Sequence, residues 1–193
     1  MPVADEALHA LADQLRGDDS VISPYVTDPD RAEPTLGRLA AAGPSAAADP
    51  AEYALLIETI REGYLLHHGQ PRVIAGADED LALLAGDYLY ALGLERLAAL
   101  GDLAAIRELA DLISLSAQLH AEGREGGSEL WLASVTAVAA GPNPAHERAK
   151  SGLRRAEADA PEALWRRAVR TAEEAEIGDA LGHAAEAIGF QPH

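Results

Sequence analysis

Residues 53–100 read YALLIETIREGYLLHHGQPRVIAGADEDLALLAGDYLYALGLERLAAL, and this stretch decides the fold. It has two apolar halves, joined by a short segment that contains Gly69, Pro71 and Gly76. Apolar and small residues recur at steps of three and four in both halves: Leu56, Ile60, Gly63, Tyr64 and His67, then Leu81, Leu84, Ala85, Tyr88, Leu89 and Leu92. That spacing predicts two helices, each buried along one wide face.

Capping signals fix where these two helices begin and end. Asp49 followed by Pro50 starts the first, which we expect to run to about His68. Asp78 starts the second and Gly101 ends it. The same signals predict further helices over 5–15, 35–42, 103–122, 130–140, 145–158 and 161–188, with an irregular segment over 16–33 that packs against the core.

The predicted fold class is all-α, a helical bundle, because no segment shows the alternation of a strand. The length of 193 residues fits a single domain over residues 1–193. Its core spans about 50–140, and a tail rich in Ala, Arg and Glu spans about 145–190. We expect Trp165, Val169 and Ile177 to anchor that tail, and an arginine- and glutamate-rich face to stay in solvent.

Composition excludes several classes of function. The formal net charge of −17 repels nucleic acid and anionic membranes. The chain has no cysteine, and therefore neither disulfides nor a thiolate zinc site. We expect no membrane span, because Asp87, Glu95 and Arg96 interrupt the most apolar helix. No basic, apolar leader stands at the start, so we expect a cytoplasmic protein.

Two motifs resemble the all-trans polyprenyl diphosphate synthase family. That family carries a helix of the form E-L-I-H-T-x-x-L-I-H-D-D-x-x-D, followed later by L-A-x-L-A-G-D-Y-L. Residues 58–67 are similar to the first, and residues 81–89 match the second closely. Residues 188–191, Ile-Gly-Phe-Gln, are similar to a C-terminal family motif. The resemblance implies a truncated isoprenoid synthase fold.

The departures from the family concern its chemistry. The family binds magnesium through the first Asp-rich motif, whose three acids are replaced here by His68, Gly69 and Arg72. The chain also ends where the second Asp-rich motif would begin. An imidazole, a glycine and a guanidinium cannot replace three carboxylates around a hard cation. We therefore assign no catalytic residue, no metal ligand and no cofactor.

A second alignment places Glu58 and Glu62 on the two outer aspartates of that motif. The two glutamates are four residues apart on one helix face, so they could share a magnesium ion. If this alignment is the correct one, the protein is a residual magnesium-dependent prenyltransferase.

A candidate ligand pocket follows from the resemblance. The fifth residue before the family's first Asp-rich motif forms the floor of the chain-binding pocket, and Gly63 stands there. Gly63 either opens an apolar channel between the helices 50–68 and 78–100 or permits their close packing. The candidate pocket residues are Gly63, Tyr64, His67, Asp87 and Tyr88.

Three functions follow. The first is a non-catalytic subunit in isoprenoid biosynthesis, associated with itself or with a larger prenyl synthase. The second is a small helical protein that binds an apolar prenyl or lipid ligand. The third is the residual enzyme that uses Glu58 and Glu62.

Overall fold

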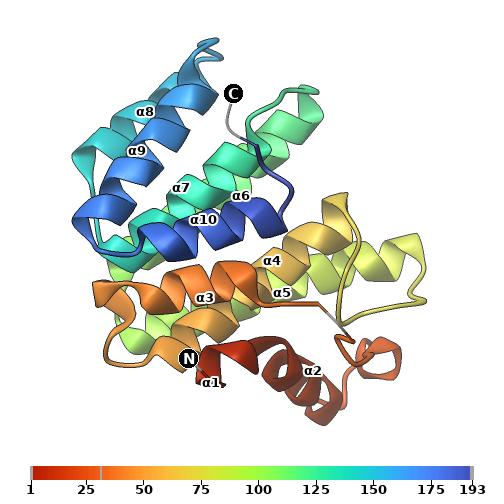
Figure 1. Ribbon diagram of the computed structural model, residues 1–193. Helices are drawn as coiled ribbons and strands as arrows, with labels where there is room; N and C mark the ends of the chain where they lie inside the picture. The colour runs from red at the N-terminus through yellow and green to blue at the C-terminus, as the bar shows by residue number, and fades with distance from the viewer. Residues whose placement is uncertain (1, 31, 192–193) are drawn as a thin grey trace.

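The computed structural model describes residues 2–30 and 32–191, and this part of the chain is helical (Figure 1). The helices, in order, are α1 (Pro2–Asp5), α2 (Ala7–Gly17), α3 (Thr35–Ala42), α4 (Pro50–His68), α5 (Glu79–Leu100), α6 (Leu103–Ala121), α7 (Gly127–Ala140), α8 (Pro144–Arg154), α9 (Ala160–Glu174) and α10 (Gly178–Ala187). Two short 3-10 turns lie over Ser23–Tyr25 and Pro44–Ala46. The predicted all-α bundle is confirmed. No described helix is both long enough and apolar enough to traverse a bilayer.

The predicted caps form as side-chain hydrogen bonds at three helix starts. Asp49, Asp78 and Asp102 accept the backbone N–H groups of the residues three positions ahead, at 3.1, 2.9 and 2.9 Å. Each bond satisfies one of the N–H groups that a helix start leaves without a partner. At the far end of α5, Gly101 has φ +76°, a conformation that favours glycine and stops the helix.

Two helices form the centre of the molecule. α4 packs against α1, α2, α3 and α5, and α7 packs against α3, α6, α8, α9 and α10. Every residue from Leu130 to Ala139 of α7 is buried, as expected for a helix that is apolar all round. In Figure 1, α1 and α2 lie at one end of the molecule and α8 and α9 at the other.

One continuous set of buried apolar side chains extends from α3 to α10. The tail therefore packs on the same core as the central helices. A second, smaller cluster lies beneath α2 and α5 and contains Ile22, Val73 and Ile74. An isolated antiparallel bridge between Val26 and Ile74 holds the irregular segment down. That segment packs as predicted, except that Val21 is 68% exposed.

Small residues, rather than leucines, form the contact between α4 and α5. A Cβ atom at Gly63 would lie 2.9 Å from the Gly86 carbonyl oxygen, and one at Gly93 would lie 2.5 Å from Ile60. The residues of α5 that contact α4 here are thus Gly86, Tyr90 and Gly93. The expected inward face was wrong at Leu84 and Tyr88, which are 57% and 38% exposed.

Two further expectations were wrong. The predicted helix over 161–188 is two helices, because Glu176 adopts φ +58° and reverses the chain between α9 and α10. The reversal lets α10 bury Leu181 and Ala184 against α3, α7 and α9. On α6, the sequence pattern of the helix over 103–122 also placed Leu103 on the inward face, but this residue is 70% exposed, because the helix turns Ala105, Leu109 and Leu112 inward.

Candidate functional site

The residues proposed from the family resemblance do not meet in one pocket. Gly63 contacts Gly86 and Tyr90, so the space where the channel was expected is filled by the α4–α5 contact. The same contact carries His67, whose ring stacks on Tyr90 with 5.4 Å between ring centroids. Of the two possible roles of Gly63, the structure shows the close packing.

Asp87 and Tyr88 lie at the surface. The Asp87 side chain is 75% exposed, so its carboxylate is solvated and needs no partner inside the fold. Its Oδ1 lies 3.2 Å from His67 Nε2, but the two atoms are not aligned for a hydrogen bond. The Tyr88 hydroxyl donates to Asp18 at 2.9 Å on the outer side of α5. Tyr64 points elsewhere, and its hydroxyl lies 2.9 Å from His120 Nε2 on α6.

Glu58 and Glu62 form a buried ion network with Arg72. Both glutamates are fully buried. Arg72 donates from Nη1 to Glu58 at 2.6 Å and from Nε to Glu62 at 3.0 Å. The other Glu58 oxygen accepts the Gly37 N–H at 2.6 Å, and the other Glu62 oxygen accepts two backbone N–H groups, of Arg72 and Val73.

All four carboxylate oxygens of this pair are therefore occupied. Burial alone would lower the pKa of Arg72, but the charges and hydrogen bonds of Glu58 and Glu62 outweigh it and raise that pKa. A magnesium ion at Glu58 and Glu62 would have to displace a guanidinium and three backbone donors. The network fastens the segment after α4 to α3 and α4, and its chemistry is that of a structural ion pair.

A cavity lies where α6, α7 and α8 meet. Its volume is about 460 Å³, within the range of small-molecule sites of roughly 300–1,000 Å³. Ala104 and Ala105 of α6, Ala137 and Val138 of α7, and Gly141, Pro142 and Pro144 form the apolar half of the lining. The polar lining residues are Ser45, Asp102, Arg107, Glu108, Asn143, His146 and Glu147.

A buried charge cluster forms one wall of this cavity. Glu108 of α6 lies 2.8 Å from His146 Nε2 and accepts from Lys150 Nζ at 2.5 Å. Lys150 also pairs with Asp111 at 3.1 Å and Glu147 at 3.0 Å. Lys150 is fully buried, and its ammonium has three N–H donors for three carboxylates. The buried ammonium group therefore has a carboxylate partner for each of its N–H donors.

The electrostatics of the cluster keep Glu108 ionised. Burial would raise the pKa of Glu108, but the hydrogen bonds and charges of His146 and Lys150 lower it to about 2. Burial would lower the pKa of Lys150, but Glu108 and the neighbouring acids raise it. An ionised Glu108 only accepts, so the contact between the two groups is a hydrogen bond that His146 donates from Nε2.

Glu108, His146 and Glu147 also bring three ligand atoms within 4.8 Å of one another, as a metal site would. Lys150 pairs with both of these carboxylates, so its ammonium already supplies the positive charge that a metal ion would bring. The geometry favours an internal ion cluster beside a cavity over a metal centre.

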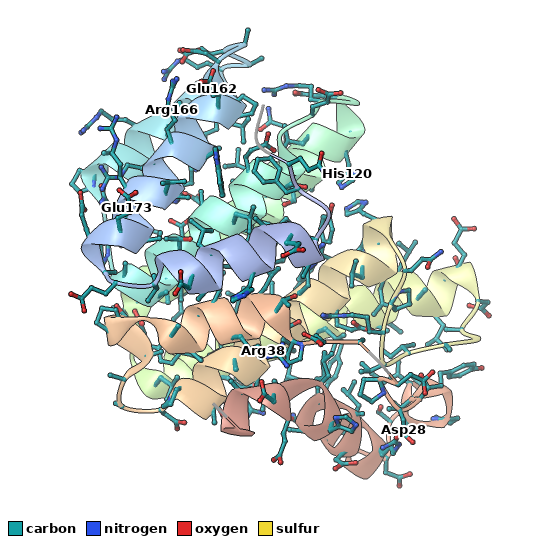
Figure 2. All side chains as sticks on the ribbon, in the orientation of Figure 1. Asp28, Arg38, His120, Glu162, Arg166 and Glu173 are labelled. Carbon is teal, nitrogen blue, oxygen red and sulfur yellow. The ribbon has the colours of Figure 1, made fainter. Side chains whose placement is uncertain are left out.

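Sequence reasoning did not single out this cluster. One feature of the sequence could have indicated it: of the fifteen Lys and Arg residues, Lys150 is the only lysine and the other fourteen are arginine. A compact ammonium can serve three acceptors that converge from different directions, whereas a planar guanidinium cannot. By contrast, the face of α9 predicted to lie in solvent does so, with Arg166 and Glu162 paired at 2.7 Å (Figure 2).

Comparisons with protein-family models, with curated proteins and with solved structures find no match to this chain. The likeness to polyprenyl synthases therefore stands on the sequence motifs alone.

Proposed function

We propose that this protein binds a small, largely apolar ligand in the cavity between α6, α7 and α8. The carrying observation is a cavity of about 460 Å³ with alanine, valine and proline on one part of its wall and a buried charge cluster on another. An apolar pocket with a few convergent polar groups is the usual form of a small-molecule site. The ligand class is that of a short prenyl chain or another lipid-like molecule.

The polar lining favours a neutral head group. Asp102, Glu108 and Glu147 contribute three acids, against Arg107 as the arginine of the lining. That balance disfavours a diphosphate. The carboxylates of this lining are hydrogen-bond acceptors, so the ligand end that matches them is a donor such as a hydroxyl group. A prenyl alcohol therefore suits the cavity better than a prenyl diphosphate does.

The test is displacement of a neutral apolar fluorophore, N-phenyl-1-naphthylamine. We expect saturable fluorescence with the wild-type protein, reversed by farnesol and much less by farnesyl diphosphate. The variant Ala104→Trp places a large ring at the exposed rim of the cavity and should abolish the signal. Ala117→Trp makes the same change at an exposed position of α6 outside the cavity lining and should leave it intact. Equal signals from the two variants would overturn the proposal.

Association with a larger prenyl synthase subunit is a second candidate, supported by the surface of α5 and the start of α6. Leu83, Leu84 and Leu100 are 43, 57 and 42% exposed, and Leu103 follows at 70%. Leu83 and Leu84 are adjacent near the start of α5, while Leu100 and Leu103 lie near its end, and exposed apolar side chains of this kind can mark an interaction surface. The net charge of −17 disfavours two identical copies and favours a less acidic partner.

Light scattering combined with pull-down from the native host tests this association. The expected result is recovery of a longer prenyl synthase chain, lost in Leu84→Lys and retained in Leu55→Met, a control within the folded core. A monomer at high concentration, with no synthase recovered, would refute the association while leaving the ligand-binding proposal in place.

A further inference from the structure

A second, smaller cavity of about 210 Å³ lies between α4, α6 and α7. It is lined by Arg61, Ser116, His120, Arg124, Ser128 and Trp131, together with four other residues. No Asp or Glu is among the described residues that line it, although the chain contains 32 of them. The volume is below the range of drug-sized sites, so it suits one compact group rather than a whole ligand.

Arg61 brings a positive charge to this cavity. Its guanidinium carbon lies 4.7 Å from the ring centroid of Tyr64 and 4.7 Å from that of Trp131. Neither of these rings carries a negative charge, and no carboxylate of residues 2–30 or 32–191 lies within ion-pair distance of Arg61. Burial lowers the pKa of Arg61. A cation held away from water in this way gains from an anion beside it.

Two buried polar atoms and a helix start also border the cavity without partners. Ser116 and Trp131 are 3% and 2% exposed, and neither Ser116 Oγ nor Trp131 Nε1 has a hydrogen-bond partner. The fourteen-residue helix α7 begins at Gly127 with no side-chain cap. Its first N–H groups are donors, and its dipole is positive at this end. Each of these groups offers a hydrogen to an acceptor.

Two other basic side chains, His120 and Arg124, line the cavity, and both have partners within the fold. His120, labelled in Figure 2, stacks on His68 at the end of α4 with 3.9 Å between ring centroids. Arg124 is already engaged, because it pairs with Glu122 at 2.8 Å and donates to the Leu153 carbonyl at 2.7 Å. The charge that lacks an internal partner is therefore that of Arg61.

We propose that this cavity binds an oxyanion, the phosphate or carboxylate group of a small ligand, without a metal ion. Arg61 supplies the charge, and the amide groups at the start of α7 with the Ser128 hydroxyl supply directional hydrogen bonds. The site is separate from the α6–α8 cavity and does not depend on the function proposed for it.

Titration with sodium phosphate and with sodium acetate, each at fixed pH and ionic strength, tests the proposal by ¹H–¹⁵N NMR. The indole N–H of Trp131 and the amides of Gly127 and Ser128 should shift and saturate. The indole of Trp165 on α9, outside the cavity, is the internal reference. Saturation by either ion supports the site and shows which oxyanion it takes.

Variants separate binding from folding. Arg61→Met should weaken binding on the order of tenfold or more, because it removes a charge-assisted contact. Arg155→Met removes the same charge at a side chain that is 63% exposed and should not change binding. Ser128→Asp should abolish binding while leaving stability equal or higher, because an acid suits a helix start.

Shifts that do not saturate, or that affect Trp165 equally, would overturn the proposal. Equal binding by Arg61→Met and the wild type would do the same.

Discussion

Replacing Lys150 with methionine should destabilise the protein strongly, because it leaves Glu108 buried and ionised without its cation. Methionine keeps most of the length of the side chain and removes the ammonium. Removing one partner of a buried pair costs about 3–5 kcal/mol. The lowering of the Glu108 pKa from 4.5 to about 2 gives a similar figure, about 3 kcal/mol, part of which belongs to His146.

The expected loss is therefore about 3 kcal/mol of unfolding free energy, roughly 6–12 °C in Tm for a chain of this size. Urea denaturation followed by circular dichroism measures it. The double variant Glu108→Gln with Lys150→Met should be closer to the wild type than Lys150→Met alone, because it removes the unpaired charge. Arg155→Met breaks a solvent-exposed pair and should cost less than about 0.5 kcal/mol.

The loss should depend on pH with a definite sign. The folded-state pKa of Glu108 lies below its unfolded value, so its stabilisation is present above pH 4.5 and is lost as pH falls toward about 2. In the variant this carboxylate has lost its cation and is protonated at higher pH. The gap between wild type and variant should thus be widest above about pH 5 and should close toward pH 2.

Because Lys150 is the only lysine, its burial can also be measured by chemical modification of its amine. An amine-acylating reagent should modify it only after unfolding. Modification of native protein at the rate of an exposed lysine, or a cost of Lys150→Met below about 1 kcal/mol, would refute the description of the cluster.

Three other changes test the rest of the structure. Gly63→Leu should lower the free energy of unfolding by on the order of 1–3 kcal/mol, measured by thermal unfolding, because Gly86 and Tyr90 fill the space beside Gly63. An unchanged Tm would instead indicate an open channel. Arg72→Met should cost about 3–5 kcal/mol in urea denaturation, because Glu58 and Glu62 stay buried without their cationic partner, and a cost near zero would contradict that network. In a radiochemical assay with magnesium and with allylic and homoallylic diphosphates, the purified protein should not extend the prenyl chain. Product formation that Glu58→Gln abolishes would instead support the alternative of a residual enzyme.

The sequence by itself determined the helices of the centre. Asp49, Asp78 and Asp102 each cap a helix, and Gly101 stops one, because these effects act within a few residues and are written locally. The helix over 130–140 was likewise predicted, and the structure adds that it is buried on all sides. The reversal at Glu176 was missed because a non-glycine residue adopts the left-handed conformation there.

Tertiary structure alone decided which face of each helix is buried and which charges meet. Leucine periodicity pointed to Leu84 and Tyr88, but the glycines of α4 and α5 let the backbones approach and turned those two side chains outward. The partners of each buried ion pair come from separate segments, as Arg72 does for the glutamates of α4 and Lys150 for Glu108 of α6. Such a pairing cannot be predicted from a local sequence pattern, because it depends on which distant segments meet in the fold. The candidate sites consist of these ion pairs and of the cavities beside them.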